Sequence, residues 1–373
     1  MKYYLIAGEA SGDLHGSNLM KALTKKDPDA TFRFYGGNLM QSVGGKLIKH
    51  YKEMAYMGLD VIFHLPAILK NMHNCKADLL SWKPDVLILI DYPGFNMRMA
   101  EFAHQHSIKV FYYISPKVWA WKEGRVKQLK KLVDTLYVIF PFEVEYFRKH
   151  SIESIYFGNP LNDSIDDFTK LNIDFETFVQ QNTLEPKPII ALVPGSRLGE
   201  VTRILPDMVK ALEDQSGYQL VVAGAPAIPH DIYNKIIKAG NVKVVYNQTY
   251  SLIANASLAV VTSGTATLET ALLKTPQVVV FKTNFLAFLI GRVVIKLKYF
   301  SLVNLIMNQM VVKEFLQLNL VKQMRNEVNA IINNESYRHQ MLTNYDTIEK
   351  MLGKPGVADR IANHMVQLLK KTN

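Results

Sequence analysis

Short apolar runs alternate with helix-like stretches along this chain, and this alternation limits its fold more than any other feature. In the first half the strand-like runs are Tyr3–Ala7, Phe32–Tyr35, Val86–Ile90, Lys109–Ile114, Leu136–Ile139 and Ser154–Phe157. The helix-like stretches between them include Gly16–Thr24, Asn96–His106 and a basic segment from about Glu123 to Val133. Strands that alternate with helices predict a parallel sheet with helices on both faces.

The same alternation begins again after a change in composition. Residues 162–187 are polar, acidic and weakly periodic, so we place a linker there. The second set of strand-like runs is Ile189–Val193, Tyr218–Ala223, Lys243–Tyr246, Leu258–Val261 and Gln277–Phe281. We predict an α/β protein with two doubly wound, Rossmann-like domains, residues 1–165 and 166–345, followed by a terminal helical segment, 346–373. Ligands bind beyond the carboxyl ends of such strands, so we expect a cleft that both domains face.

Composition excludes several classes of protein. Hydrophobic residues make up 49% of the chain, which argues against disorder. The single cysteine, Cys75, excludes an internal disulfide and a cysteine-based zinc site, and fits a reducing compartment. The first apolar run is too short for a signal peptide. The best candidate for a membrane span, Phe285–Met307, is interrupted by three basic residues and falls short of the ~20 apolar residues that a span needs.

Positive charge is clustered. The formal net charge is +10, and Lys117–Lys131 alone contains six Lys or Arg residues. Such clusters suit anionic lipid, phosphorylated substrates or nucleic acid, although a solvated helix face is the usual explanation of any one of them. Because the chain has no RNA-binding signature and no zinc-finger spacing, nucleic acid ranks last.

The turn Thr262–Glu269 is the strongest local indication of a ligand. It follows the apolar run Leu258–Val261 and enters a predicted helix. Backbone N–H groups and the helix dipole at such a turn suit a phosphate or diphosphate, and Glu269 can accept hydrogen bonds from a ribose diol. The turn therefore indicates a nucleotide. The alternative is an ordinary helix N-cap by Ser263 or Thr265.

The loop Gly8–Gly16 follows the first predicted strand and contains Glu9, Asp13 and His15. It lacks the dinucleotide fingerprint, and its two acids would repel a pyrophosphate, so sugar hydroxyls suit it better. A capped helix with surface acids is the alternative. The loop that begins at Asp91 follows a very apolar strand, and a partly desolvated carboxylate there has a raised pKa that suits a general base. An ordinary Asp-Pro-Gly turn is the alternative there.

Two further loops follow predicted strands. Ser115–Trp121 contains two tryptophans and Lys117, which suit a sugar face or the edge of an acyl chain; a packed loop is the alternative. Val193–Val201 contains Arg197, which can bind a phosphate through two parallel hydrogen bonds. The acidic pattern Asp27-Pro28-Asp29 lies on the side away from the strand carboxyl ends, so we interpret it as a turn.

Together these loops resemble the bacterial lipid-A-disaccharide synthase family. The matching segments span nearly the whole chain. They are Gly8–Asp13, Met57-Gly58, Asp91–Asn96, Tyr113–Trp121, Pro141–Glu143, Gly158–Leu161, Val193–Arg197, Ser263–Glu269, Leu302–Ile306 and Glu314–Gln317. Their order and combination carry the resemblance, because any one of them is weak alone.

The resemblance implies a glycosyltransferase B fold and transfer of 2,3-diacylglucosamine from its UDP derivative to 2,3-diacylglucosamine 1-phosphate. The product would be the β-1,6-linked lipid A disaccharide 1-phosphate, with inversion at the anomeric carbon and release of UDP. It also implies a nucleotide in the C-terminal domain, an acceptor in the N-terminal one, and a terminal helix that packs back on the N-terminal domain. Some relatives form a swapped dimer, so a homodimer is an implied partner.

We assign site residues on this basis. The catalytic group is Asp91, Glu9 and Asp13, with Asp91 as the base. The nucleotide group is Gly195, Ser196, Arg197, Ser263, Gly264, Thr265, Ala266, Thr267, Glu269 and Asn304. The acceptor or acyl-chain group is Ser11, Asn96, Ser115, Trp119 and Trp121. We expect no metal and no cofactor, because Arg197 and helix-end N–H groups can offset the charge on UDP.

The chain departs from the family pattern in places. Gly94 stands where some relatives have an acid, and Val303 replaces a frequent proline. His15 is not required in the family and ranks below Asp91 as base. The alternatives to this function are another UDP-N-acetylglucosamine enzyme, such as the lipid II N-acetylglucosaminyltransferase or a 2-epimerase, and a non-catalytic nucleotide-sugar or lipid-binding protein.

Lipid substrates imply a cytoplasmic protein at the inner face of the inner membrane. Residues 61–72 are strongly apolar, and a helix after Pro66 would place Ile68, Leu69 and Met72 on one face. We predict that Ile62, Phe63, Ile68 and Leu69 contact the membrane, with nearby basic clusters adding attraction. A core helix is the alternative.

Overall fold

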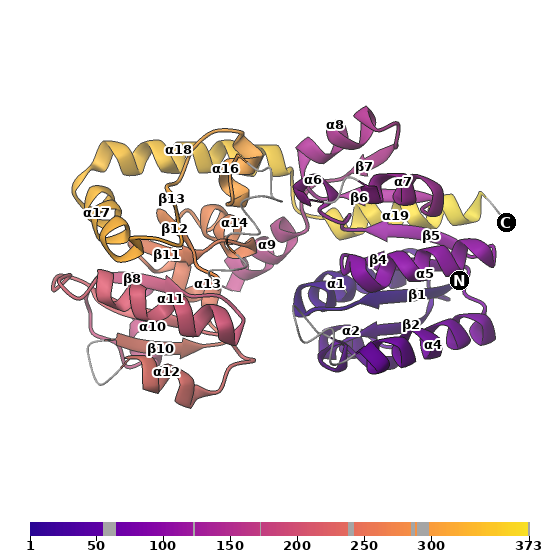
Figure 1. Cartoon of the computed structure of the whole chain (residues 1–373), viewed down its shortest axis with the longest axis horizontal. Helices are drawn as coiled ribbons and strands as arrows, with labels where there is room; N and C mark the ends of the chain where they lie inside the picture. Colours follow the sequence, from indigo (N-terminus) through magenta and orange to yellow (C-terminus); the bar gives the residue numbers. More distant parts are fainter. Residues whose placement is uncertain are drawn as a thin grey trace. The chain divides into compact units, whose positions relative to one another are not determined.

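The computed structural model describes residues 1–54, 65–121, 124–171, 173–237, 242–284, 288 and 298–371. It divides into two compact units. The first comprises Met1–Asp163 together with Gly353–Asn373, and the second comprises Ser164–Leu352. Each unit is built on one parallel sheet (Figure 1).

The first unit has a seven-stranded sheet with the order β3-β2-β1-β4-β5-β6-β7. Its strands are β1 (Lys2–Ala7), β2 (Thr31–Gly36), β3 (Lys46–His50), β4 (Val86–Ile90), β5 (Lys109–Tyr113), β6 (Thr135–Val138) and β7 (Ser154–Tyr156). The order reverses at β1, as in doubly wound sheets, which places the loops after β1 and β4 side by side. Strands β1 and β4 are buried on both faces, which explains their continuous apolar sequence.

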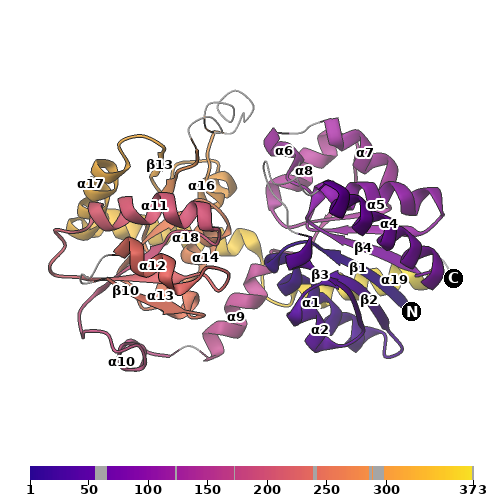
Figure 2. The same cartoon turned by 60° about the horizontal axis from the view of Figure 1, so that its bottom comes forward.

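Helices cover both faces of this sheet (Figure 2). They are α1 (Ala10–Lys26), α2 (Asn38–Val43), the 3₁₀ turn η1 (Tyr51–Glu53), α4 (Leu65–Trp82), α5 (Pro93–Gln105), α6 (Val118–Trp121), α7 (Gly124–Leu132), α8 (Pro141–Lys149) and α19 (Val357–Lys370). Alternate residues of β1 enter two cores. Tyr3 and Leu5 pack with α1 and α19, whereas Tyr4 and Ile6 pack with α4, α5 and α7.

The second unit has a six-stranded sheet with the order β10-β9-β8-β11-β12-β13. Its strands are β8 (Ile189–Val193), β9 (Gln219–Gly224), β10 (Val242–Tyr246), β11 (Leu258–Thr262), β12 (Gln277–Phe281) and β13 (Glu314–Leu316). Its helices are α10 (Phe175–Gln181), α11 (Leu198–Ala211), α12 (His230–Ile237), α13 (Thr249–Ala254), α14 (Thr265–Leu272), α16 (Leu302–Met307), α17 (Leu320–Asn333) and α18 (Glu335–Leu352). Helix α9 (Leu161–Leu171) begins in the first unit and continues into the second.

The segment 162–187, which its polar composition predicts to be a linker, is largely helical, and the boundary between the two units falls within it, between Asp163 and Ser164. It holds most of α9 and all of α10. Polar side chains dominate here because one side of each helix is solvated, while Phe168 packs edge to face on Tyr250 and Phe178 is fully buried. Asp174 caps α10 by accepting a hydrogen bond from the Thr177 N–H.

One carboxylate attaches the C-terminal helix to the first unit. Asp163 Oδ1 accepts hydrogen bonds from the N–H groups of Gly356 (2.6 Å) and Val357 (3.0 Å), and its Oδ2 accepts one from Ala358 (2.9 Å). These are N–H groups that the first turn of α19 leaves without helical partners. The Arg360 guanidinium donates to the Phe157 carbonyl in the same region. Helix α19 then packs along α1.

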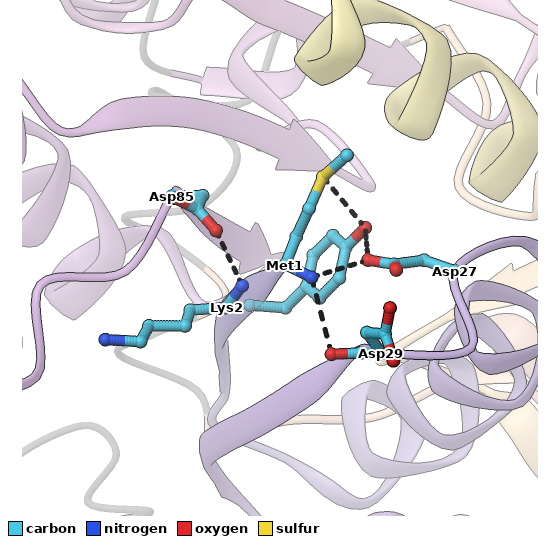
Figure 3. A network of polar contacts seen from close by, with 6 residues as sticks. Met1, Lys2, Asp27, Asp29 and Asp85 are labelled. Carbon is cyan, nitrogen blue, oxygen red and sulfur yellow. Dashed lines mark hydrogen bonds and ion pairs between the residues drawn. The ribbon is translucent and has the colours of Figure 1, made fainter. Parts of the chain in front are cut away.

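A second polar network lies at the start of β1 (Figure 3). Asp27 Oδ2 accepts hydrogen bonds from the Met1 ammonium at 2.9 Å and the Tyr3 hydroxyl at 3.0 Å, while Asp85 accepts one from the Lys2 N–H. Burial raises the pKa of Asp27, but these donors outweigh it, and the pKa lies below its usual value. The Asp27-Pro28-Asp29 segment is thus a turn at the amino edge of the sheet.

His15 is buried within α1, with 7% of its surface exposed. Within the part of the chain that the structure describes, its Nδ1 has no hydrogen-bond partner. Burial lowers the pKa of His15 to about 4, because the charged imidazolium would lose its hydration. The side chain is therefore neutral at pH 7, and its protonation opposes folding.

We predict that Asp163→Ala lowers the free energy of unfolding by about 1–2 kcal/mol, because three N–H groups lose their acceptor. Urea unfolding followed by circular dichroism measures the change. The control is Asp167→Ala, an exposed acid on the same helix α9, which should stay within about 0.5 kcal/mol of the parent. Equal stability of the two variants would show that the Asp163 attachment contributes nothing.

We predict a pH-dependent contribution from His15. Unfolded chains take up the proton below the ordinary pKa of 6.5, whereas the folded protein resists it down to about 4. Stability is therefore lost as pH falls through this window, by about 2 kcal/mol between pH 7 and pH 5. His15→Leu should lose that much less stability over the same interval, and the exposed His104→Leu should behave like the parent. An unchanged pH dependence in His15→Leu would contradict the assignment.

Candidate functional site

In the first unit, the predicted site loops follow three neighbouring strands, β1, β4 and β5. Their carboxyl ends lie at one edge of the sheet, where ligands of doubly wound sheets bind. Gly8 explains how two of these loops meet. A Cβ on Gly8 would lie 2.2 Å from the Tyr92 ring, so only glycine lets the loop after β4 approach the loop after β1.

Asp91 directly follows β4 and has an unusual backbone conformation. Asp91 and Tyr92 have φ values of +43° and +47°, in the left-handed region that costs energy for residues other than glycine. The Asp91 carbonyl is held by hydrogen bonds of 2.7 Å from Asn96 Nδ2 and from the Tyr112 hydroxyl. Burial raises the pKa of the Asp91 carboxyl, and the Lys117 charge and the Tyr92 N–H only partly oppose it. The carboxyl therefore has the raised pKa expected of a general base.

Asn96 has a structural role in this geometry. It is fully buried, and its amide nitrogen also lies 3.2 Å from the Ile90 carbonyl, so it holds the loop after β4 in place. We therefore reassign Asn96 from acceptor contacts to support of Asp91.

Asp13 has a structural role. Its carboxylate accepts hydrogen bonds from the N–H groups of Gly37 (2.8 Å), Leu39 (3.0 Å) and Met40 (3.0 Å), and only 3% of the residue is exposed. Asp13 therefore caps α2, and we withdraw it from the catalytic group. Glu9 is half-buried at the N-cap of α1, and Ser11 is exposed in the first turn of that helix.

Glu143, in the first turn of α8, holds the loop after β5 in place, a role that the sequence did not predict. Its Oε1 accepts hydrogen bonds of 3.0 Å from the Ser115 hydroxyl and Trp119 Nε1, and its Oε2 accepts two more from the N–H groups of Ile139 and Phe140. Burial raises the pKa of Glu143, although these four donors oppose it. The O–H of Ser115 and the N–H of Trp119 are thus both donated to Glu143. In the sequence, the match of Pro141–Glu143 to the family pattern was the signal that pointed to Glu143.

The indole ring of Trp119 can still contact other groups, because its hydrogen bond to Glu143 uses only the ring N–H. The indole is half-buried and stands edge to face on Phe142, with ring centroids 5.0 Å apart. An apolar ligand such as an acyl chain suits such an aromatic pair. The side chain of Trp121 lies outside the described residues.

In the second unit, the turn Thr262–Glu269 joins β11 to α14. The Ser263 hydroxyl donates to the Phe300 carbonyl (2.9 Å), and the buried Thr267 hydroxyl donates to the Gly264 carbonyl (2.8 Å). These hydroxyls fix the shape of the turn. Gly264 and Thr265 are exposed and Ala266 is half-buried, so the backbone N–H groups at the start of α14 are the donors available to an anion.

Glu269 lies one turn further along α14. Its Oε1 accepts a 2.8 Å hydrogen bond from the Tyr250 hydroxyl. Burial raises the pKa of Glu269, and the Tyr250 hydrogen bond opposes this rise. The carboxylate is therefore placed to accept hydrogen bonds from a ligand that carries hydroxyl groups.

The loop Gly195–Arg197 follows β8, which pairs with β11, so the two loops leave neighbouring strands. Gly195 has a φ of +107°, and a Cβ there would lie 2.4 Å from Glu200 Oε2. Glu200 accepts hydrogen bonds from the Ser196 N–H (3.2 Å) and from Arg197 Nη1 (3.0 Å). The Arg197 side chain is 54% exposed, and a guanidinium can bind a phosphate through two parallel hydrogen bonds.

We remove Asn304 from the nucleotide-binding residues that we predicted. It is fully buried, accepts hydrogen bonds from the N–H groups of Val311 and Val312, and donates to the Val312 carbonyl and to Glu314. This fills the hydrogen-bonding capacity of its side chain. Glu314 in turn accepts from the N–H groups of Phe300 and Ser301. Asn304 therefore supports the segment beside the turn and does not bind nucleotide through its side chain.

The structure of helix α4 changes which residues we expect to contact the membrane. Ile62 and Phe63 lie outside the described residues. Leu69 is 51% exposed, but Ile68 is half-buried and packs against the same core as the buried Met72. The three residues thus do not share one exposed face, because Ile68 and Met72, four residues apart on α4, both pack against the core. Leu65 and Leu80 are exposed on the side of Leu69.

Basic helix α7 presents a solvated face. Val126, Leu129 and Leu132 are buried, whereas the lysines between them are exposed. Among the described residues, no helix has the length and apolar character needed to cross a membrane. In the same portion of the chain, no group of three or more His, Cys, Asp or Glu side chains is arranged to hold a metal ion.

Solved structures of low sequence identity share the fold. The S. aureus MnaA–UDP co-structure matches with a TM-score of 0.68 at 13% identity, covering 99% of this chain and 97% of that one. The Methanocaldococcus jannaschii UDP-GlcNAc 2-epimerase in complex with UDP-GlcNAc and UDP matches with a TM-score of 0.68 at 13% identity, over 98% and 100% of the two chains. At this identity they confirm the glycosyltransferase B type of fold alone.

Sequence relatives identify the family. The family model described as lipid-A-disaccharide synthetase matches residues 3–361. The lipid-A-disaccharide synthase of Syntrophus aciditrophicus is 38% identical over 99% of this chain and 98% of its own. That of Myxococcus xanthus is 34% identical over 98% and 97%. The chain therefore belongs to the lipid-A-disaccharide synthase family of glycosyltransferases.

Proposed function

We propose that this glycosyltransferase of lipid A biosynthesis transfers 2,3-diacylglucosamine from its UDP derivative to 2,3-diacylglucosamine 1-phosphate. The acceptor 6-hydroxyl attacks the anomeric carbon as the bond from that carbon to the diphosphate breaks. The products are the β-1,6-linked disaccharide 1-phosphate and UDP, and a single displacement inverts the anomeric centre. The observation that carries this proposal is the full-length match to the family.

The nucleotide belongs to the second unit in this proposal. Three features support this placement: the N–H groups at the start of α14, the exposed Arg197 side chain, and Glu269 one turn into the same helix. The diphosphate accepts from the N–H groups and from Arg197, and the ribose diol donates to Glu269. The S. aureus and M. jannaschii proteins of similar fold carry UDP in their structures.

Asp91 acts as the base. It removes the proton from the acceptor 6-hydroxyl while the new bond forms, and the charge left on UDP is stabilised by Arg197 and the helix-end N–H groups. A raised pKa favours this role, because a more basic carboxylate accepts the proton more readily. We expect no metal in this step.

The enzyme also contacts a membrane surface, from the cytoplasmic side, through α4. Leu65, Leu69 and Leu80 are 46%, 51% and 44% exposed, and Lys70 is exposed beside them. Apolar side chains flanked by cations suit an interface with anionic lipid. Such a contact gives acyl-chain substrates a route from the bilayer to the enzyme.

The reaction is tested by incubating pure protein with the diacylated UDP-sugar and acceptor and detecting the disaccharide by mass spectrometry. In parallel, Arg197→Ala should weaken UDP binding in calorimetric titrations about tenfold or more, a loss of about 1.4 kcal/mol per decade. Arg203→Ala, an exposed arginine one turn along α11, is the matched control and should bind UDP like the parent. Absence of disaccharide, or equal UDP affinity of the two variants, would contradict the proposal.

We predict that replacing Leu65, Leu69 and Leu80 together by serine moves the protein from sedimented anionic phospholipid vesicles into the supernatant. The fold should persist, because these side chains are largely exposed and such substitutions cost little stability. Leu171→Ser, at an 82% exposed leucine on α9, controls for a general loss of apolar surface. Unchanged vesicle binding by the folded triple variant would remove α4 from the membrane contact.

A further inference from the structure

Glu269 is paired with a tyrosine from another helix. The Tyr250 hydroxyl, on α13, donates a 2.8 Å hydrogen bond to Glu269 Oε1, on α14. The two helices pack directly on each other. One carboxylate oxygen of Glu269 is thus fixed by the protein, and the second oxygen retains its capacity to accept hydrogen bonds.

Tyr250 is itself held in place. Its ring stands edge to face on Phe168 of α9, with centroids 5.5 Å apart and an interplanar angle of 80°. Burial and the charge of Glu269 raise the pKa of Tyr250 far above its ordinary value, so the hydroxyl stays protonated and donates. A packed ring and a permanent donor together hold one carboxylate oxygen of Glu269 in place.

We infer that Tyr250 is a positioning residue that aims Glu269 at the ribose and so makes the enzyme prefer ribonucleotides over nucleotides that lack ribose hydroxyls. This inference rests on the proposed nucleotide site. Carboxylates select hydroxyl-bearing ligands most strongly when their orientation is fixed in advance, because binding then costs no reordering of the side chain. Without its tyrosine donor, Glu269 rotates more freely and stays protonated to a higher pH.

The test compares calorimetric affinities for UDP and for 2′,3′-dideoxy-UDP. The parent should bind UDP more tightly. Tyr250→Phe should weaken UDP binding about five- to tenfold, as expected for one lost hydrogen bond, and leave dideoxy-UDP binding unchanged. In a Glu269→Ala background, Tyr250→Phe should have no further effect, because the tyrosine acts only through that carboxylate.

Tyr337→Phe is the matched control. The Tyr337 hydroxyl donates a 2.6 Å hydrogen bond to Glu327, the same kind of pair, but it joins α18 to α17. This variant should change neither affinity.

Phe168→Leu tests the positioning role of Tyr250 in a second way. It removes the ring that holds Tyr250 while keeping the Tyr250 hydroxyl, and it should also lower the preference for UDP over dideoxy-UDP.

The outcomes separate the inference from the proposed function. If Tyr250→Phe weakens both nucleotides equally, or adds its effect to Glu269→Ala, the positioning role is wrong while the nucleotide site stands. If the parent binds UDP and dideoxy-UDP equally and Glu269→Ala changes neither, the assignment of ribose to Glu269 itself is wrong.

Discussion

The fold depends on carboxylates that accept hydrogen bonds from the backbone N–H groups of loops and helix starts. Doubly wound sheets place many such groups at loop turns, and a buried N–H without an acceptor is costly. Asp13 accepts three at α2, Asp163 accepts three at α19, and Glu314 accepts two before α16. Glu143 accepts two together with the Ser115 and Trp119 side chains. Each carboxylate joins two separate segments of the chain, and Glu143 in this way holds the loop after β5.

This use of carboxylates separates two kinds of acid in the site loops. Burial raises the pKa of Asp91, Glu143 and Glu269 alike, so the direction of the shift does not distinguish them. Their donors do. Glu143 has four, whereas Glu269 has the Tyr250 hydroxyl and Asp91 has the Tyr92 N–H and the Lys117 charge against its burial. Acids that the fold stabilises least gain most from a ligand that donates a hydrogen bond or a proton, which is why we place the chemistry at Asp91 and the ribose at Glu269.

Sequence patterns predicted all of the described strands except β3 and β13, which lie at sheet edges, as the correctly predicted β7 and β10 also do. Strands β1 and β4 are buried on both faces and therefore appear as continuous apolar runs, whereas the edge strand β3 contains two lysines and a histidine, and β13 has only three residues. The positions of the site loops followed from the strands. The roles of Asp13 and Asn304 did not, because a motif cannot show whether a side chain is used by backbone groups of another segment; for Asp13 those groups lie more than 20 residues away. Glu143 was missed because its side-chain partners, Ser115 and Trp119, lie more than 20 residues away in the sequence.

A comparison of Asp91→Asn with Asp13→Asn tests most directly whether the site acids divide in this way. Turnover with saturating donor and acceptor, and urea unfolding, are measured for both variants. Asp91→Asn should lower kcat by about 10²–10⁴ and leave the free energy of unfolding nearly unchanged. Asp13→Asn should do the reverse, losing about 1–3 kcal/mol of stability while its folded fraction keeps kcat within a few-fold of the parent. A near-normal kcat in Asp91→Asn, or full stability with lost turnover in Asp13→Asn, would contradict the account.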